Sequence, residues 1–133
     1  MGKTAKDKRD IYYRKAKEEG YRARSAYKLM HIDDHFNLFN PEVCRVVDLC
    51  AAPGSWSQVI SKRLKAMGRD IVNERCLVSV DLYPLAPIEG CTMIKGDITR
   101  QKTVDEIHEV FGNGAQLVVS DGAPDVLGDH DFD

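Results

Sequence analysis

The sequence predicts an α/β fold, a mostly parallel sheet with flanking helices. Four short apolar runs each lead to an acidic residue, and they are Val46–Asp48, Val78–Asp81, Thr92–Asp97 and Leu117–Asp121. Helical patterns alternate with these runs, which is typical of parallel strands covered by helices. The chain of 133 residues has room for one core, so we expect one domain.

Two helices are expected at the N-terminal end. Polar residues 5–19 are compatible with a helix, Gly20 interrupts it, and a second helix is expected from Ser25 to about Phe36. The inward positions of this second helix repeat at helical spacing and are Ala26, Leu29, Ile32 and Phe36. Its opposite stripe is Arg24, Lys28, His31 and His35.

The rest of the chain alternates strands with helices. Strands are expected at 45–49, 76–81, 92–95 and 116–120. One helix is expected around 57–67, after a turn of small residues at 51–54. A second helix is expected to begin with Thr103 as its N-cap and to end before Gly112. This order of elements completes the predicted sheet.

The charge is distributed unevenly along the chain. The formal net charge is −2, but residues 1–28 carry ten Lys and Arg against four Asp and Glu, whereas residues 29–133 carry nine against seventeen. A basic segment of this kind is either a solvated helix face or a contact surface for nucleic acid. Four tyrosines lie among its charges and favour RNA, because aromatic rings stack on unpaired bases. We therefore expect Arg22, Arg24 and the lysines before them to hold RNA phosphates.

Several classes of protein do not fit the composition. No apolar run approaches the roughly 18–20 residues of a membrane span, and the N-terminus has no apolar signal core. The four cysteines, Cys44, Cys50, Cys76 and Cys91, form no CxxC pair. Their spacing predicts no metal site and no disulfide framework, and it favours reduced thiols in a cytoplasmic protein.

The acidic strand ends predict the kind of ligand. Ligands of open α/β sheets bind beyond the carboxyl ends of the strands, where the strand order reverses. Several carboxylates there suit a nucleoside that carries a positive charge, such as S-adenosylmethionine, better than a bare phosphate. The turn at 51–54 lets the backbone approach a ligand closely, although a tight strand-to-helix connection would look the same. The GxGxxG motif of a nicotinamide dehydrogenase is absent.

Two of these acids have alternative explanations. Asp81 can accept hydrogen bonds from both hydroxyls of a ribose, but an acid at a strand end also caps turns. Asp97 follows Gly96, and Gly-Asp is common in turns of every kind. Neither residue identifies a ligand by itself.

Several motifs in the same order carry a resemblance to a known family. They are the segments Lys6–Asp10, Tyr21–Leu29, Asp48–Gln58, Val80–Leu82, Gly96-Asp97 and Ser120–Asp125. On these motifs the chain resembles the FtsJ/RrmJ-like ribose 2′-O-methyltransferases. It is most similar to the eukaryotic branch that methylates the tRNA anticodon loop. The resemblance implies a Rossmann-like fold, S-adenosylmethionine as cofactor, tRNA as substrate and an accessory protein subunit as partner.

The resemblance also implies roles for particular residues. It assigns Lys28 and Asp121 to catalysis, and it assigns cofactor binding to Gly54, Trp56, Asp81, Asp97 and Asp121. A lone lysine on a helix is more often a solvated residue, so the role of Lys28 depends on its motif. Trp56 can equally be a packing residue at the start of a helix. No metal site is implied.

The resemblance leaves part of the family's site unmatched. The family also uses a second lysine and a glutamate, and neither has a counterpart in residues 1–133. We therefore expect the N-terminal portion of one methyltransferase domain, truncated on its C-terminal side and catalytically incomplete alone. Residues 1–40 would face RNA, and residues 41–133 would form the cofactor-binding half of the sheet. The alternatives are methylation of ribosomal RNA and a non-catalytic RNA-binding scaffold.

Overall fold

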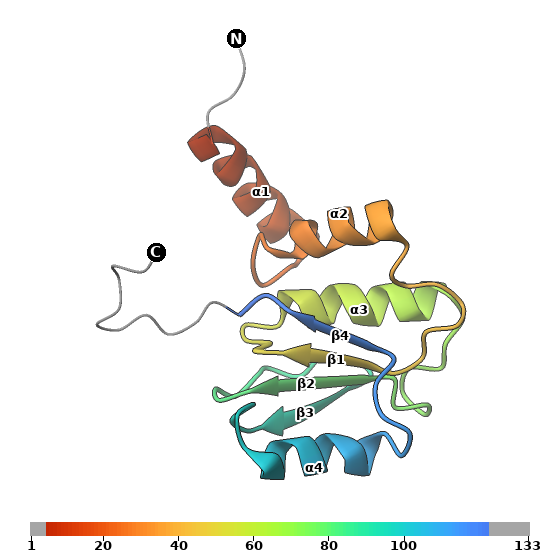
Figure 1. The fold of residues 1–133 in the computed structure, drawn as a ribbon. Helices are drawn as coiled ribbons and strands as arrows, with labels where there is room; N and C mark the ends of the chain where they lie inside the picture. The colour runs from red at the N-terminus through yellow and green to blue at the C-terminus, as the bar shows by residue number, and fades with distance from the viewer. Residues whose placement is uncertain (1–4, 123–133) are drawn as a thin grey trace.

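The computed structural model describes residues 5–122 and contains four helices and four strands. The helices are α1 (Ala5–Glu19), α2 (Ala26–Phe36), α3 (Ser55–Ala66) and α4 (Gln101–Val110). The strands are β1 (Val46–Leu49), β2 (Leu77–Asp81), β3 (Cys91–Lys95) and β4 (Leu117–Ser120). All three pairings in the sheet are parallel (Figure 1). The predicted α/β fold with a parallel sheet and flanking helices is confirmed.

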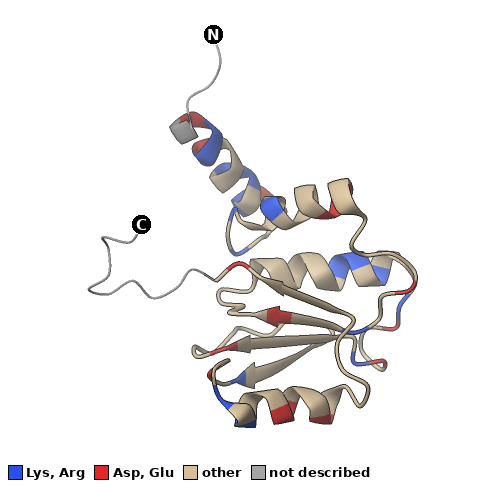
Figure 2. Ribbon diagram, viewed as in Figure 1, with Lys and Arg blue, Asp and Glu red and all other residues tan. Residues whose placement is uncertain are grey.

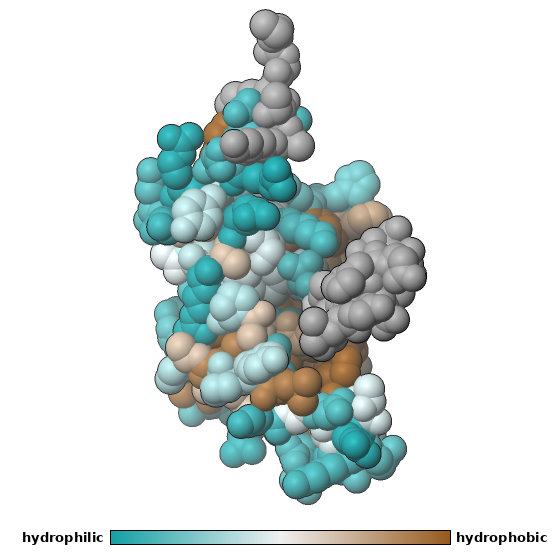
Figure 3. Space-filling view, turned by 90° about the vertical axis from the view of Figure 1, so that its left-hand side faces the viewer, coloured by the Kyte–Doolittle hydropathy of each residue, from teal (hydrophilic) through white to brown (hydrophobic). Residues whose placement is uncertain are grey.

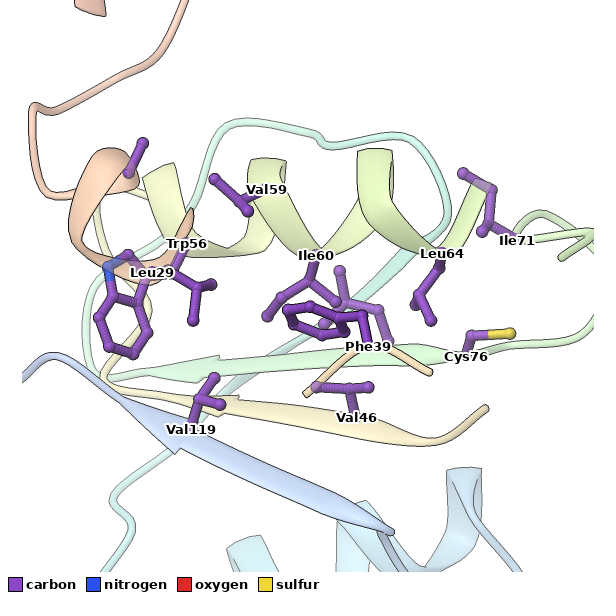
Figure 4. Packing of buried hydrophobic residues seen from close by; sticks show 12 residues of the cluster. Leu29, Phe39, Val46, Trp56, Val59, Ile60, Leu64, Ile71, Cys76 and Val119 are labelled. Atoms are coloured by element: carbon purple, nitrogen blue, oxygen red, sulfur yellow. The ribbon is translucent and has the colours of Figure 1, made fainter. Parts of the chain in front are cut away.

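The helices form layers on the two faces of the sheet. Helix α3 covers one face and α2 packs on α3, whereas α4 covers the other face (Figure 1). Successive residues of a strand point to opposite faces, so Val46 joins the cluster under α3 and Val47 joins the cluster beside α4. Figure 4 shows the first cluster, in which Leu29 of α2 and Ile60 of α3 meet the sheet. Burial on both faces explains the largely apolar sequences of the two central strands, β1 and β2.

The strand order indicates where on the sheet a ligand would bind. The order across the sheet is β3-β2-β1-β4, so the chain moves outward from β1 to β3 and then returns to the other side of β1. The reversal lies between β1 and β4, where Leu49 is in register with Ser120. Ligands of open α/β sheets bind at such a point, beyond the carboxyl ends. The residues that follow Leu49 and Ser120 are therefore the first candidates for a functional site.

Helix α2 buries a different residue from the one expected. Phe36 was expected to face inward, but its side chain is 68% exposed. Asp33 is buried instead, because one carboxylate oxygen accepts a hydrogen bond from the backbone N–H of Phe39 at 2.9 Å. The other oxygen lies 3.3 Å from Arg63 of α3. The predicted outer stripe is confirmed, since Lys28 and its neighbours on that face are exposed.

Two helices begin earlier than the sequence indicated. Helix α3 starts at Ser55. Gly54, the last residue of the preceding turn, has a left-handed backbone with a φ of +113°. Helix α4 starts at Gln101, so Thr103 lies inside it and is not its N-cap. Thr103 is buried and packs on Gly96. A Cβ added at Gly96 would lie 2.7 Å from the hydroxyl oxygen of Thr103. None of the helices described is long and apolar enough to cross a membrane.

Candidate active site

The turn after β1 is held by the acid at the end of β2. One carboxylate oxygen of Asp81 accepts a hydrogen bond from the backbone N–H of Ala52 at 2.8 Å. The other accepts from the N–H of Tyr83 at 2.9 Å. Asp81 therefore caps two loops, which is the alternative that the sequence left open. A carboxylate has about four acceptor positions, so Asp81 keeps room for the hydroxyls of a ribose.

A second acid lies beneath this turn. Asp48 of β1 is 1% exposed, and its carboxylate accepts a hydrogen bond from Ser57 of α3 at 2.7 Å. Burial raises the pKa of Asp48 to about 6 against the opposing effect of the Ser57 hydrogen bond, and the charges of Asp121 and Asp81 raise it further. Three carboxylates therefore lie near enough to interact, and they concentrate negative charge at the point where the strand order reverses.

The buried acid has a consequence for stability. Because the pKa of Asp48 is raised on folding, the folded state binds more protons than the unfolded state between its ordinary value of 3.8 and about 6. The free energy of unfolding should therefore fall as the pH rises through this window, by roughly 2–3 kcal/mol. Asp48→Asn should remove this dependence. Urea unfolding of both proteins at pH 4 to 7 checks it, and a difference between them that does not change with pH would contradict it.

The two predicted catalytic residues meet at the same edge. The ammonium of Lys28 on α2 lies 3.0 Å from a carboxylate oxygen of Asp121, which follows β4. The Lys28 side chain is 64% exposed, so it can contact a second molecule. Trp56 lies below it, with the Lys28 nitrogen 6.0 Å from the ring centroid. The Trp56 ring nitrogen donates to the backbone carbonyl of Ser25 at 2.8 Å, which fixes α3 to the start of α2.

A small cavity lies beside this pair. Its volume is about 90 Å³, and it is bordered by the turn at 51–53, by Trp56 and by the carboxylates of Asp48 and Asp121. Cys50, which also borders it, packs closely on Gly122, since a Cβ at Gly122 would lie 2.4 Å from the Cβ of Cys50. Small residues, a backbone turn and two acids suit a compact cation at this place.

A larger groove opens on the other side of Lys28. It has a volume of about 840 Å³ and runs along α1 and α2 to Asp121. Its cationic residues are Lys8, Arg9, Arg22, Arg24 and Lys28, and its aromatic residues are Tyr12, Tyr13, Tyr27 and His31. Figure 2 shows the basic residues along α1 and the segment after it, and Figure 3 shows this hydrophilic part above the exposed hydrophobic residues of the sheet edge.

Two residues lie differently from what the sequence suggested. The guanidinium of Arg22 donates to the carbonyls of Pro53, Ala86 and Pro87, at 3.1, 2.8 and 2.8 Å, while it also borders the large groove, so its contact with RNA phosphates stays a prediction. Asp97 borders neither cavity. Its carboxylate accepts from the N–H and hydroxyl of Thr99, and these bonds lower its pKa. A cofactor role for Asp97 stays a prediction.

The assigned residues divide into two groups. The structure brings Lys28, Asp121 and Trp56 together, and it joins Asp81 to the turn that ends at Gly54 through Ala52. Residues 123–125 of the last family motif lie outside the described residues. Among residues 5–122, no group of three or more His, Cys, Asp or Glu is placed to hold a metal ion.

Sequence reasoning left one residue of the site unassigned. Asp48 was counted among the acidic strand ends, but it was given no role. It is the third residue of β1, and its side chain points toward α3 and the small cavity. The signal was available, because an acid inside an apolar run needs a buried partner, and Ser57 stands nine residues later.

Comparison with known proteins identifies the family. The family model described as FtsJ-like methyltransferase matches residues 21–133. A human tRNA (cytidine(32)/guanosine(34)-2'-O)-methyltransferase is 56% identical over 134 residues, which cover 100% of this chain and 39% of the human protein. A ribosomal RNA large subunit methyltransferase E from Methanothrix thermoacetophila is 46% identical over 129 residues, which cover 97% of this chain and 47% of that protein.

A solved structure supports the fold. A ribosomal RNA methyltransferase from Plasmodium falciparum superimposes with a TM-score of 0.67 at 24% identity, over 84% of this chain and 64% of that one. The chain spans less than half the length of each of these two curated relatives. Methyltransferases of the matching family use S-adenosylmethionine. The chain belongs to the FtsJ-like methyltransferase family.

Proposed function

We propose that this chain contributes to an enzyme that transfers a methyl group from S-adenosylmethionine to a ribose 2′-hydroxyl in the anticodon loop of tRNA. The observation that carries the proposal is the Lys28–Asp121 pair, 3.0 Å apart. It lies between a small acidic cavity and a large groove lined by cations and aromatic rings. A reaction that joins a cationic cofactor to RNA needs its reactive groups at such a boundary.

The cavity and the turn around it fit the cofactor. S-adenosylmethionine supplies a methyl carbon bonded to a positively charged sulfur, and carboxylates stabilise a positive charge nearby. Asp48 and Asp121 supply them in the cavity. Asp81 offers its remaining acceptor positions to the ribose hydroxyls, and Gly54 and Trp56 would border the methionine end.

The groove fits a single-stranded RNA substrate. Lys8, Arg9 and Arg24 border it and are placed to meet phosphates, whereas Tyr12 and Tyr13 are placed to stack on bases. Exposed Lys28 would then hold the 2′-oxygen and assist removal of its proton. Residues 1–40 form the RNA-facing part in this proposal, and residues 41–133 form the cofactor-binding half of the sheet.

The substrate assignment comes from the relatives. The human relative, 56% identical, is named for nucleotides 32 and 34 of tRNA. Ribosomal RNA is the second candidate, because a relative named for it is 46% identical over 97% of the chain. A cytoplasmic location agrees with four free thiols, and an accessory protein subunit stays a prediction.

Methyl transfer tests this proposal. The full-length protein, with any accessory subunit it requires, is incubated with labelled S-adenosylmethionine and an unmodified tRNA transcript. We expect label at nucleotides 32 and 34, at linkages that resist alkali because the 2′-oxygen is methylated. A transcript with 2′-deoxyribose at both positions is the matched control. Label only on ribosomal RNA would support the second candidate, and label on neither RNA would favour the non-catalytic scaffold.

A further inference from the structure

The segment between α1 and α2 is fixed to the body of the protein by its backbone. The N–H of Arg22 donates to the side-chain oxygen of Gln58 in α3 at 2.9 Å. The side-chain nitrogen of the same Gln58 donates to the carbonyl of Gly20 at 3.1 Å. These two bonds hold the backbone at residues 20–22 against the start of α3, so the Arg22 side chain extends from a fixed position.

From this position the Arg22 side chain binds two loops at the carboxyl edge of the sheet, which is the proposed place of the cofactor. One guanidinium nitrogen donates to the carbonyls of Pro53 and Ala86, and the other donates to Pro87. Pro53 belongs to the turn after β1, and residues 86 and 87 belong to the loop after β2. Asp81 binds the N–H of Ala52 in the same turn. An anion and a cation therefore hold adjacent residues of one turn.

The turn is also fitted to the guanidinium in shape. A Cβ at Gly54 would lie 2.7 Å from a guanidinium nitrogen and 3.6 Å from the Cδ of Arg22. A larger residue would displace this side chain, and the φ of +113° at Gly54 is one that other residues rarely adopt. Among the residues that the structure describes, Arg22 belongs to no ion pair. Its guanidinium binds neutral carbonyls of the two loops. Arginine can bind several carbonyls at once because its donors form a planar fork.

We infer that Arg22 is a positioning residue for the methyl donor, which sets the turn at 51–54 and couples it to the RNA-facing segment. Arg22 thus acts on the cofactor through the turn, although it stands in the most basic part of the chain. The inference rests on the proposed function, because it takes the turn as the place where the methyl donor binds.

Kinetic constants for each substrate separate this role from RNA binding. In the full-length protein, Arg22→Ala should raise the KM for S-adenosylmethionine at least tenfold, with little change in the KM for tRNA. Arg22→Lys keeps the charge on a single nitrogen, so its KM for S-adenosylmethionine should lie between those of Arg22→Ala and the wild type. Loss of folded protein alone would lower the apparent kcat and leave both KM values unchanged. That outcome for both variants would overturn the inference.

The matched control is Arg24→Ala, since Arg24 is exposed and borders the groove. It should weaken tRNA binding and reduce the slope of log affinity against log salt by about 1, with the affinity for S-adenosylmethionine unchanged. Arg22→Ala should leave this slope unchanged. A reduced slope for Arg22→Ala with unaltered affinity for S-adenosylmethionine would overturn this inference but would leave the proposed function standing. A wild-type protein that binds no methyl donor would remove both the inference and the proposed function.

Discussion

Lys28→Ala and Asp121→Ala should each lower the rate of methyl transfer about 10²–10⁴-fold in the full-length protein, the range for a group that assists proton transfer. A ribose hydroxyl is a weak nucleophile, so its oxygen must be oriented and its proton removed. Lys28 is an exposed cation of the large groove, and Asp121, which borders both cavities, holds its ammonium at 3.0 Å. Single-turnover methylation at saturating cofactor and RNA measures the chemical step directly.

Two further variants sharpen this test. Lys102→Ala, on exposed α4 away from the site, is the matched control and should retain the wild-type rate. Lys28→Arg keeps the charge but stays protonated, so a restored rate would mean that Lys28 supplies only a positive charge. Full activity of Lys28→Ala would contradict the catalytic assignment. Residues 1–133 alone should show almost no turnover, because the family's second lysine and glutamate have no counterpart in them.

Gly54→Ala should abolish most of the binding of S-adenosylmethionine, with an expected loss in affinity of well over tenfold. The new Cβ would lie 2.7 Å from a guanidinium nitrogen of Arg22 and 3.0 Å from the side chain of Ile88. The φ of +113° at this position is also one that alanine rarely adopts. Arg22 must therefore move, and the turn would lose the hydrogen bond that Arg22 donates to the carbonyl of Pro53. Calorimetric titration with S-adenosylmethionine measures the change.

Gly68→Ala is the matched control for this variant. Gly68 follows α3 with a φ of +85°, but nothing lies within 4 Å of the position of an added Cβ. It should lower the melting temperature through backbone strain and leave donor affinity unchanged. If Gly54→Ala behaved as Gly68→Ala does, the close packing of Arg22 on the turn would have no part in cofactor binding.

The sequence indicated the sheet well because its signals are local. Each strand is a short and largely apolar run, and an acid follows or ends it in every case except β1, where Asp48 lies buried inside the strand. The strand order did not follow from the sequence, since β4 could have joined the free side of β3 or of β1, and the structure shows that it joins β1. Lys28 and Asp121 were brought together by the family motifs, because 93 residues separate them and no local pattern relates them.

The errors arise where distant residues decide the local outcome. Periodicity placed Phe36 inward, but Asp33 is buried there because its carboxylate meets donors from Arg63 and the Phe39 backbone. Charge indicated an RNA contact for Arg22, but it could not show that three carbonyls from two loops accept its hydrogen bonds. In both cases a charged side chain is held by groups remote in sequence, and composition cannot reveal such partners.

The central claim is that the carboxyl edge of this sheet binds a methyl donor, and calorimetric titration of the full-length protein with S-adenosylmethionine and with NAD tests it most directly. The account predicts saturable binding of S-adenosylmethionine and of its demethylated product, and little or no binding of NAD. Asp81→Ala should weaken donor binding at least about tenfold, since it loses acceptors for the ribose and the bond that holds Ala52. Tight binding of NAD, with no heat from the methyl donor, would contradict the account.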